Sequence, residues 1–87
     1  MAQVIYAAHA LSELQRAHRA GNVSAIQSAI ENLATHPLVG RRLEGDLREL
    51  VISLGETGFI ALYRFDLQQD EVRVLALRSQ REIGYLP

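Results

Sequence analysis

The sequence predicts an α+β fold with the element order β-α-α-β-β-β, a mostly antiparallel four-stranded sheet with a short helical hairpin packed on one face. Two observations lead to this class. Apolar residues recur every three or four positions over residues 8–36, which is the period of amphipathic helices. They alternate or run continuously over residues 47–54, 59–65 and 72–78, which is typical of strands. The chain has 87 residues, so residues 1–87 are expected to form a single domain.

The first two elements are expected to be a strand and a helix. The segment Gln3–Tyr6 reads QVIY, and such apolar, β-branched runs favour strands. From residue 8 onward, Leu11, Leu14 and Ala17 fall on one face of a helix. Gly21 then supplies the glycine that commonly follows a helix C-terminus.

A second helix is expected to complete the hairpin. The sequence SAIQ at Ser24–Gln27 matches a capping box, in which the serine caps the N-terminus of the helix. Ile26, Ile30 and Leu33 form the apolar stripe of this helix. Pro37 ends it, because proline restricts the preceding residue and lacks an amide proton.

The rest of the chain is expected to form three strands after a loop at Pro37–Asp46. Short polar or glycine-containing segments separate these strands, as in hairpin connections. The strands are expected at Leu47–Leu54, Phe59–Phe65 and Val72–Arg78, and the turns at Gly55–Gly58 and Asp66–Glu71.

Both faces of the predicted sheet are apolar. Because two short helices cover one face only, the other requires a partner segment or a second copy of the chain, unless loops and chain ends cover it. Alternation sets Phe59, Ala61, Tyr63 and Phe65 against Ile60, Leu62 and Arg64 in one strand, and Val72, Val74 and Ala76 against Arg73, Leu75 and Leu77 in the next.

Composition excludes several classes of site. The formal net charge is −1, which points to no particular class of partner. All nine basic residues are arginine; arginine suits carboxylate and phosphate recognition, although a coding bias explains this equally well. Without cysteine, the chain forms neither disulfides nor thiolate metal sites. His9 and His18 are nine residues apart, which is not the spacing of a helical metal pair, so we expect no metal and no cofactor.

The N-terminal sequence MAQVIYAAHALSEL has neither the basic region of a signal peptide nor an apolar stretch long enough for a membrane anchor. We therefore expect a cytoplasmic protein with no membrane association.

The segments HPLVGRRLEGDLRELVISLGETGFIALYRFD (36–66) and VRVLALRSQREIGY (72–85) resemble the RelE/ParE superfamily of toxins from bacterial type II toxin–antitoxin (plasmid stabilisation) modules. The resemblance lies in the order of His-Pro, Gly-Arg-Arg, Leu-Arg-Glu-Leu, Leu-Tyr-Arg and Gln-Arg-Glu. It implies the β-α-α-β-β-β fold, a cytoplasmic target, and a cognate antitoxin (ParD-like or similar) whose C-terminal segment wraps the toxin. The stretch from Ala10 to Pro37 is shorter than in typical members.

Two activities occur in this superfamily. RelE-type members cleave mRNA on the ribosome, and the resemblance would assign that chemistry to Arg48, Arg81 and Tyr85. Cleavage also requires cations around the phosphorane, yet Glu49 and Ser53 stand where the nucleases carry lysines, and Ile60 where they carry an arginine.

This incomplete set favours the ParE branch, whose studied members inhibit DNA gyrase by binding it, and a toxin that arrests growth without being an enzyme. A ribosome-dependent mRNA endoribonuclease is the alternative. A degenerate member that binds antitoxin without toxicity is a third possibility, suggested by the short hairpin.

The antitoxin or the target is expected to bind the last strands and the segment that follows them. Each candidate also has a purely structural explanation, either a solvated arginine or, for Tyr85, packing at the edge of the core. Loop residues Arg41 and Arg42 are expected to pair with Glu44 and Asp46, and Arg48 with Glu49. The candidates for binding are Arg64, Arg73, Leu75, Leu77, Arg78, Arg81 and Tyr85.

Overall fold

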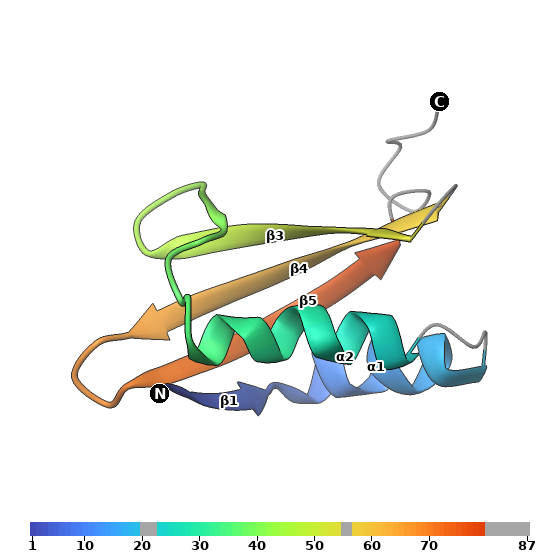
Figure 1. Ribbon diagram of the computed structural model, residues 1–87, viewed down its shortest axis with the longest axis horizontal. Coiled ribbons are helices and arrows are strands. Elements are labelled where there is room, and N and C mark those ends of the chain that lie inside the picture. Colours follow the sequence, from blue (N-terminus) through green and yellow to red (C-terminus); the bar gives the residue numbers. More distant parts are fainter. Residues whose placement is uncertain (20–22, 55–56, 80–87) are drawn as a thin grey trace.

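The computed structural model describes residues 1–19, 23–54 and 57–79. Within these residues the chain forms one five-stranded sheet in the order β1-β5-β4-β3-β2, with the helices on one face (Figure 1). The predicted α+β class is confirmed, with one strand more than expected. The elements are β1 (Gln3–Tyr6), α1 (Ala8–Arg19), α2 (Val23–Glu31), a 3-10 turn (Asn32–Ala34), β2 (Arg41–Arg42), β3 (Leu47–Leu54), β4 (Thr57–Asp66) and β5 (Glu71–Ser79).

The additional strand is β2, which lies in the segment that the sequence predicts as a loop. It pairs antiparallel with β3, with Arg41 opposite Glu49 and Arg42 opposite Arg48. Two residues are too few to show a periodic pattern, so the sequence contains no signal for this strand. β1 runs parallel to β5, while the other pairs are antiparallel, as expected for a mostly antiparallel sheet.

The helical hairpin packs on the sheet through a stripe of small and branched residues. In α1, Ala10, Leu14 and Ala17 are at most 6% exposed. Leu11, which the spacing places on the same face, is 45% exposed. The buried stripe of α1 is therefore narrower than expected. The predicted stop at Gly21 lies outside the described residues.

The second helix differs from expectation at both ends. α2 begins at Val23, so Ser24 lies in the first turn rather than at the N-cap that the capping box requires. The helix ends at Glu31 and continues as a 3-10 turn to Ala34, well before Pro37. Ala34 O accepts a hydrogen bond of 2.8 Å from Ala2 N, which ties the end of the turn to the chain start.

The core lies between this hairpin and one face of the sheet. Tyr63, Val72 and Val74 are fully buried there, and Leu77 is 1% exposed. Their neighbours across the layer are Ile26, Ile30 and Leu33, each fully buried in α2 or the turn after it. These side chains bring the hairpin and the sheet together, because removing apolar surface from water is the main favourable contribution to folding.

A β-bulge in β5 changes which side chains face the core. Leu62 pairs with Ala76 but Tyr63 pairs with Val74, so Leu75 has no partner in β4. Beyond the bulge the alternation is reversed. Leu77 therefore joins the core and Ala76 faces the other side, contrary to the faces predicted from strict alternation.

Tyr63 anchors the loop between α2 and β2 from inside the core. Its hydroxyl accepts a 2.9 Å hydrogen bond from the backbone N–H of Gly40 and donates one of 2.8 Å to the carbonyl of Pro37. Burial raises the pKa of this hydroxyl from 10.0, an effect that the hydrogen bond from Gly40 and the charge of Arg48 partly offset. The hydroxyl thus stays protonated and holds both bonds at neutral pH.

Changing Tyr63 to phenylalanine is expected to lower the free energy of unfolding by about 1–3 kcal/mol, because it leaves a buried N–H and a carbonyl unpaired. Since the folded-state pKa of Tyr63 is raised, its contribution is present below the unfolded pKa of about 10 and is lost as the pH rises through the folded value. Urea unfolding between pH 8 and 11.5 should show a smaller alkaline loss in the variant. An equal loss in both proteins would contradict this role.

Candidate functional site

The face of the sheet opposite the helices is the main candidate site, and we call it the open face. Residues paired across neighbouring strands share a face, so the register defines its members. They include Arg41 of β2; Leu47, Glu49 and Val51 of β3; Ile60, Leu62 and Arg64 of β4; and Arg73, Ala76 and Arg78 of β5.

The centre of the open face is apolar. Ile60 is 3% exposed and Ala76 is 8% exposed, although neither belongs to the core on the helix side. Leu62 between them is half-buried, and Val51 at the edge is 52% exposed. The expectation that both faces of the sheet carry apolar residues is confirmed.

Arginines surround this centre, and three of them form ion pairs with acidic residues. Arg41 Nη2 lies 2.7 Å from Glu49 Oε1, Arg64 Nε lies 2.8 Å from Asp46 Oδ1, and Arg73 Nη2 lies 3.0 Å from Glu71 Oε1. The carboxylate side chains of Glu49 and Glu71 are only 11% and 14% exposed, while those of their arginine partners are 70% and 51% exposed. The guanidinium groups therefore form the outer layer.

Arg78 differs in its surroundings from Arg64 and Arg73, which lie next to each other on the open face. Arg78 stands opposite Ile60 and is exposed, and no carboxylate among the described residues lies within ion-pair distance of it. Arg64 and Arg73 are directly paired across β4 and β5. With Asp46, Phe65 and Glu71, they line a hollow of about 430 Å³ at the end of the sheet.

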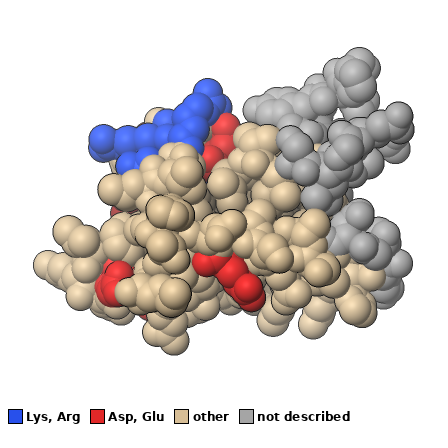
Figure 2. Space-filling view, in the orientation of Figure 1, with Lys and Arg blue, Asp and Glu red and all other residues tan. Residues whose placement is uncertain are grey.

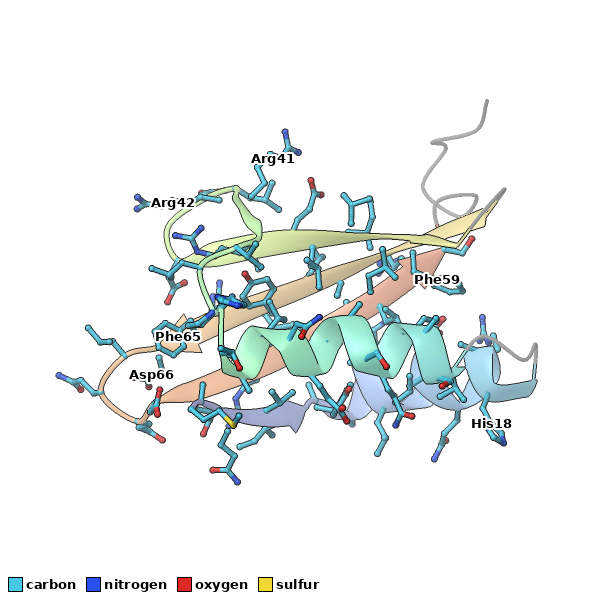
Figure 3. The ribbon with its side chains drawn as sticks, viewed as in Figure 1. His18, Arg41, Arg42, Phe59, Phe65 and Asp66 are labelled. Carbon is cyan, nitrogen blue, oxygen red and sulfur yellow. The ribbon has the colours of Figure 1, made fainter. Side chains whose placement is uncertain are left out.

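The loop arginines do not form the pairs that the sequence predicts. Arg41 binds Glu49 instead of a loop acid, and Arg42 Nε donates to the carbonyl of Gly45 at 2.7 Å. Arg48 and Glu49 do not pair, because neighbouring residues of a strand point to opposite faces. Figure 3 shows Arg41 and Arg42 pointing outward from the loop.

The proposed nuclease residues are not brought together by the described structure. Arg48 Nη1 donates to the carbonyls of Leu38 (3.1 Å) and Gly40 (2.8 Å) on the helix side of the sheet, where it supports the loop. Arg81 and Tyr85 lie outside the described residues.

Among the binding candidates, Arg64, Arg73 and Arg78 lie on the open face. Leu75 is half-buried at the bulge. Leu77 is 1% exposed and belongs to the core, so it is not accessible to a partner. The sequence reasoning missed Asp46 as the partner of Arg64, because the 18 residues that separate them leave no local signal.

Chemically, the open face is suited to binding. Its exposed guanidinium groups are donors for carboxylates, and exposed Val51 and half-buried Leu62 offer apolar contact beside the buried centre. The tyrosines of the described part stay protonated at neutral pH: the pKa of Tyr6 is raised by burial and by Glu31, and that of Tyr63 is raised by burial. Among the described residues, no group of three or more His, Cys, Asp or Glu side chains is placed to hold a metal ion. No helix of these segments has the length and hydropathy to cross a membrane. His18 lies at the far end of α1 (Figure 3).

Comparison with known proteins identifies a family and two similar solved structures. Residues 4–84 match the family model described as the ParE toxin of the type II toxin–antitoxin system parDE. A chain of the intact E. coli RelBE toxin–antitoxin complex is similar, with a TM-score of 0.75 and 15% identity over 90% of this chain and 95% of that one. A metal-bound toxin from Helicobacter pylori has a TM-score of 0.62 and 15% identity over 95% and 99% of the two chains. No curated protein matches the sequence.

Proposed function

The chain belongs to the ParE toxin family of type II toxin–antitoxin systems, and from this premise we propose that it inhibits DNA gyrase by binding it and is neutralised by a cognate antitoxin. We further propose that it acts in the cytoplasm, where its release from the antitoxin arrests growth and so stabilises a plasmid that carries the module. Inhibition by binding requires a surface and not a set of reacting groups.

The observation that carries this proposal is the apolar centre of the open face. Ile60 occupies it with 3% exposure, and Glu49 beside it is held by Arg41. A phosphorane at this position would meet an isoleucine and a carboxylate in place of cations. Because loss of one preorganised donor alone costs about 10²–10³ in rate, the described part of the face supports binding over RNA cleavage.

The same face supports the choice of an antitoxin as partner. Val51 and Leu62, the accessible apolar residues of this face, match the apolar side chains of a segment laid across a sheet. Its outward guanidinium groups match carboxylates of that segment, which charge complementarity would steer into place. The RelBE structure, solved as a toxin–antitoxin complex, is a precedent of the same fold for such a pair.

The proposal is tested with purified protein and DNA gyrase. We expect the toxin to slow supercoiling of relaxed plasmid DNA and the antitoxin of the module to restore it at equimolar amounts. In cells, expression should arrest growth and induce the DNA damage response. Translation-dependent mRNA cleavage with unchanged supercoiling would replace gyrase by the ribosome as the target. Harmless expression without antitoxin would identify a degenerate member.

Reversing the charge of both paired arginines, in the double variant Arg64→Glu and Arg73→Glu, is expected to weaken antitoxin binding by tenfold or more. Asp46 and Glu71 would lose their ion pairs, and the open face would then repel a carboxylate-rich segment. Exposed ion pairs contribute only about 0–1 kcal/mol each, so the fold should persist.

Isothermal titration with the antitoxin at two salt concentrations measures the effect, since screening weakens exposed charges. Arg16→Glu on α1, away from the sheet edge, is the matched control and should bind like the wild type. Equal affinity of the double variant and this control would place the antitoxin elsewhere.

A further inference from the structure

The loop between α2 and β2 exposes two large aliphatic side chains next to each other. Leu38 is 60% exposed and Val39 is 63% exposed. With His36 and Pro37 they border a shallow, almost entirely apolar hollow. Single exposed apolar residues are normal on protein surfaces, so exposure alone does not indicate a function.

What distinguishes this loop is how firmly its backbone is held. Tyr63 binds the carbonyl of Pro37 and the N–H of Gly40 from inside the core. Arg48 Nη1 binds the carbonyls of Leu38 and Gly40, and Val39 N bonds to His36 O at 3.2 Å. Every residue from Pro37 to Gly40 thus has a backbone hydrogen bond.

The close approach of the loop to the sheet at Gly40 also requires a glycine. A methyl group on Gly40 would lie 2.6 Å from the hydroxyl oxygen of Tyr63 and 2.8 Å from the carbonyl of Glu49. Only glycine allows the loop to approach the sheet so closely. The fold therefore commits a buried tyrosine, an arginine and a glycine to fixing a loop whose own side chains point to solvent.

Fixing an exposed apolar pair is useful for recognition. Ordering an interface during binding costs about 0.5–1.5 kcal/mol for each immobilised side chain, and a preorganised loop avoids part of that cost. Anchors that fill a pocket in the partner also carry most of the energy of an interface. Because the pair projects from the surface, the matching surface has to be concave, as on a folded protein.

The charges beside the pair indicate the chemistry of that surface. Arg41 and Arg42 follow directly in the chain and point outward from the loop in Figure 3, and Figure 2 shows basic side chains gathered at the upper left of the molecule in the same view. Arg42 has a backbone carbonyl as its partner and, within the described segments, no carboxylate. A second copy of the chain would bring these arginines against their own copies around a twofold axis, so like charges oppose self-association through this loop.

We propose that Leu38 and Val39 dock into an apolar pocket with an acidic rim on the toxin's protein target, with Arg42 pairing with that rim. This inference rests on the proposed function, since it assumes a toxin that acts by binding a protein. Tyr63 and Arg48, which hold the loop, lie on the helix side of the sheet. The target contact is therefore separate from the open face assigned to the antitoxin, and the two bindings can be measured independently.

The test compares the double variant Leu38→Ser and Val39→Ser with Leu67→Ser, an 80% exposed leucine in the turn between β4 and β5. Growth arrest in cells, affinity for purified DNA gyrase and affinity for the antitoxin are measured for both variants and the wild type. We expect the double variant to lose growth arrest and at least tenfold in gyrase affinity, with unchanged antitoxin affinity and melting temperature. Leu67→Ser should match the wild type in growth arrest and in affinity for gyrase.

Each other outcome has a distinct meaning. Undiminished growth arrest in the double variant would overturn the proposal, as would weaker binding of the antitoxin by that variant. The proposal would also fail if light scattering showed that the wild type is a dimer and that the double variant is a monomer. Loss of arrest in a chain whose wild type never binds gyrase would support the loop and remove gyrase as the target. A wild type that causes no arrest would remove both the proposed function and the proposed contact.

Discussion

Replacing Leu77 by alanine is expected to lower the free energy of unfolding by about 2–5 kcal/mol, the usual effect of truncating a fully buried leucine. Leu77 is 1% exposed and packs in the core with Ala61 and Val74. Its neighbour two positions earlier, Leu75, is half-buried at the bulge and unpaired. The Leu75→Ala variant should therefore lose clearly less stability.

Urea unfolding of the two variants at pH 7 measures this contrast, and it tests the bulge directly. In a regular strand, residues two apart share a face, so both leucines would be buried or both would be accessible. With the bulge, Leu77 serves stability while Leu75 stays near the open face. Equal losses in the two variants would mean that β5 is regular in solution.

Gly40→Ala, at a buried glycine, is expected to lower the free energy of unfolding by about 2–4 kcal/mol. Overpacking alone typically costs about 1–3 kcal/mol. The added methyl group would lie 2.6 Å from the Tyr63 hydroxyl oxygen and 2.7 Å from its Cε1 atom, so the ring or the loop must move. Either movement breaks the hydrogen bonds to Pro37 and Gly40, which adds the cost of unpaired buried groups.

Thermal unfolding followed by circular dichroism measures this loss, since each kcal/mol shifts Tm by about 4–8 °C in a domain of this size. Gly45→Ala provides a contrast with a different cause. Gly45 has a φ of 58° and no atom within 4 Å of the added methyl group, so only backbone strain of about 1 kcal/mol is expected there. Combining Gly40→Ala with Tyr63→Phe should cost less than the sum of the two single losses, because the hydrogen bonds that Tyr63→Phe removes are already broken in Gly40→Ala.

The predictable parts of the fold were those with a repeating local pattern. The bounds of β1 and β3 agree with the sequence prediction, because their apolar residues alternate or run continuously to both ends. The apolar stripes correctly predicted the two helices of the hairpin. The capping box predicted at Ser24 is not formed, because α2 begins at Val23 and Ser24 lies inside the helix. Apolar residues on both faces of β4 correctly indicated a face that the helices leave open.

The parts that escaped prediction depend on contacts distant in the chain. One unpaired residue at Leu75 reverses the faces of half a strand, and nothing in VRVLALR distinguishes that residue from its neighbours. The support of the Pro37–Gly40 loop depends on Tyr63, which follows Gly40 by 23 residues. Arg48 is adjacent to Glu49 in the sequence, yet a strand points them apart, so proximity in the chain suggested an ion pair that does not form.

The parallel pairing of β1 with β5 has a consequence for synthesis. Gln3 pairs with Glu71 and Tyr6 with Val74, so the first strand finds its partner only after residues 71–74 have emerged from the ribosome. At about 5–20 residues per second, translation keeps β1 and α1 waiting on the order of several seconds. The nascent chain cannot complete its sheet during that time, so β1 and the helices remain without their partner strand until β5 is made.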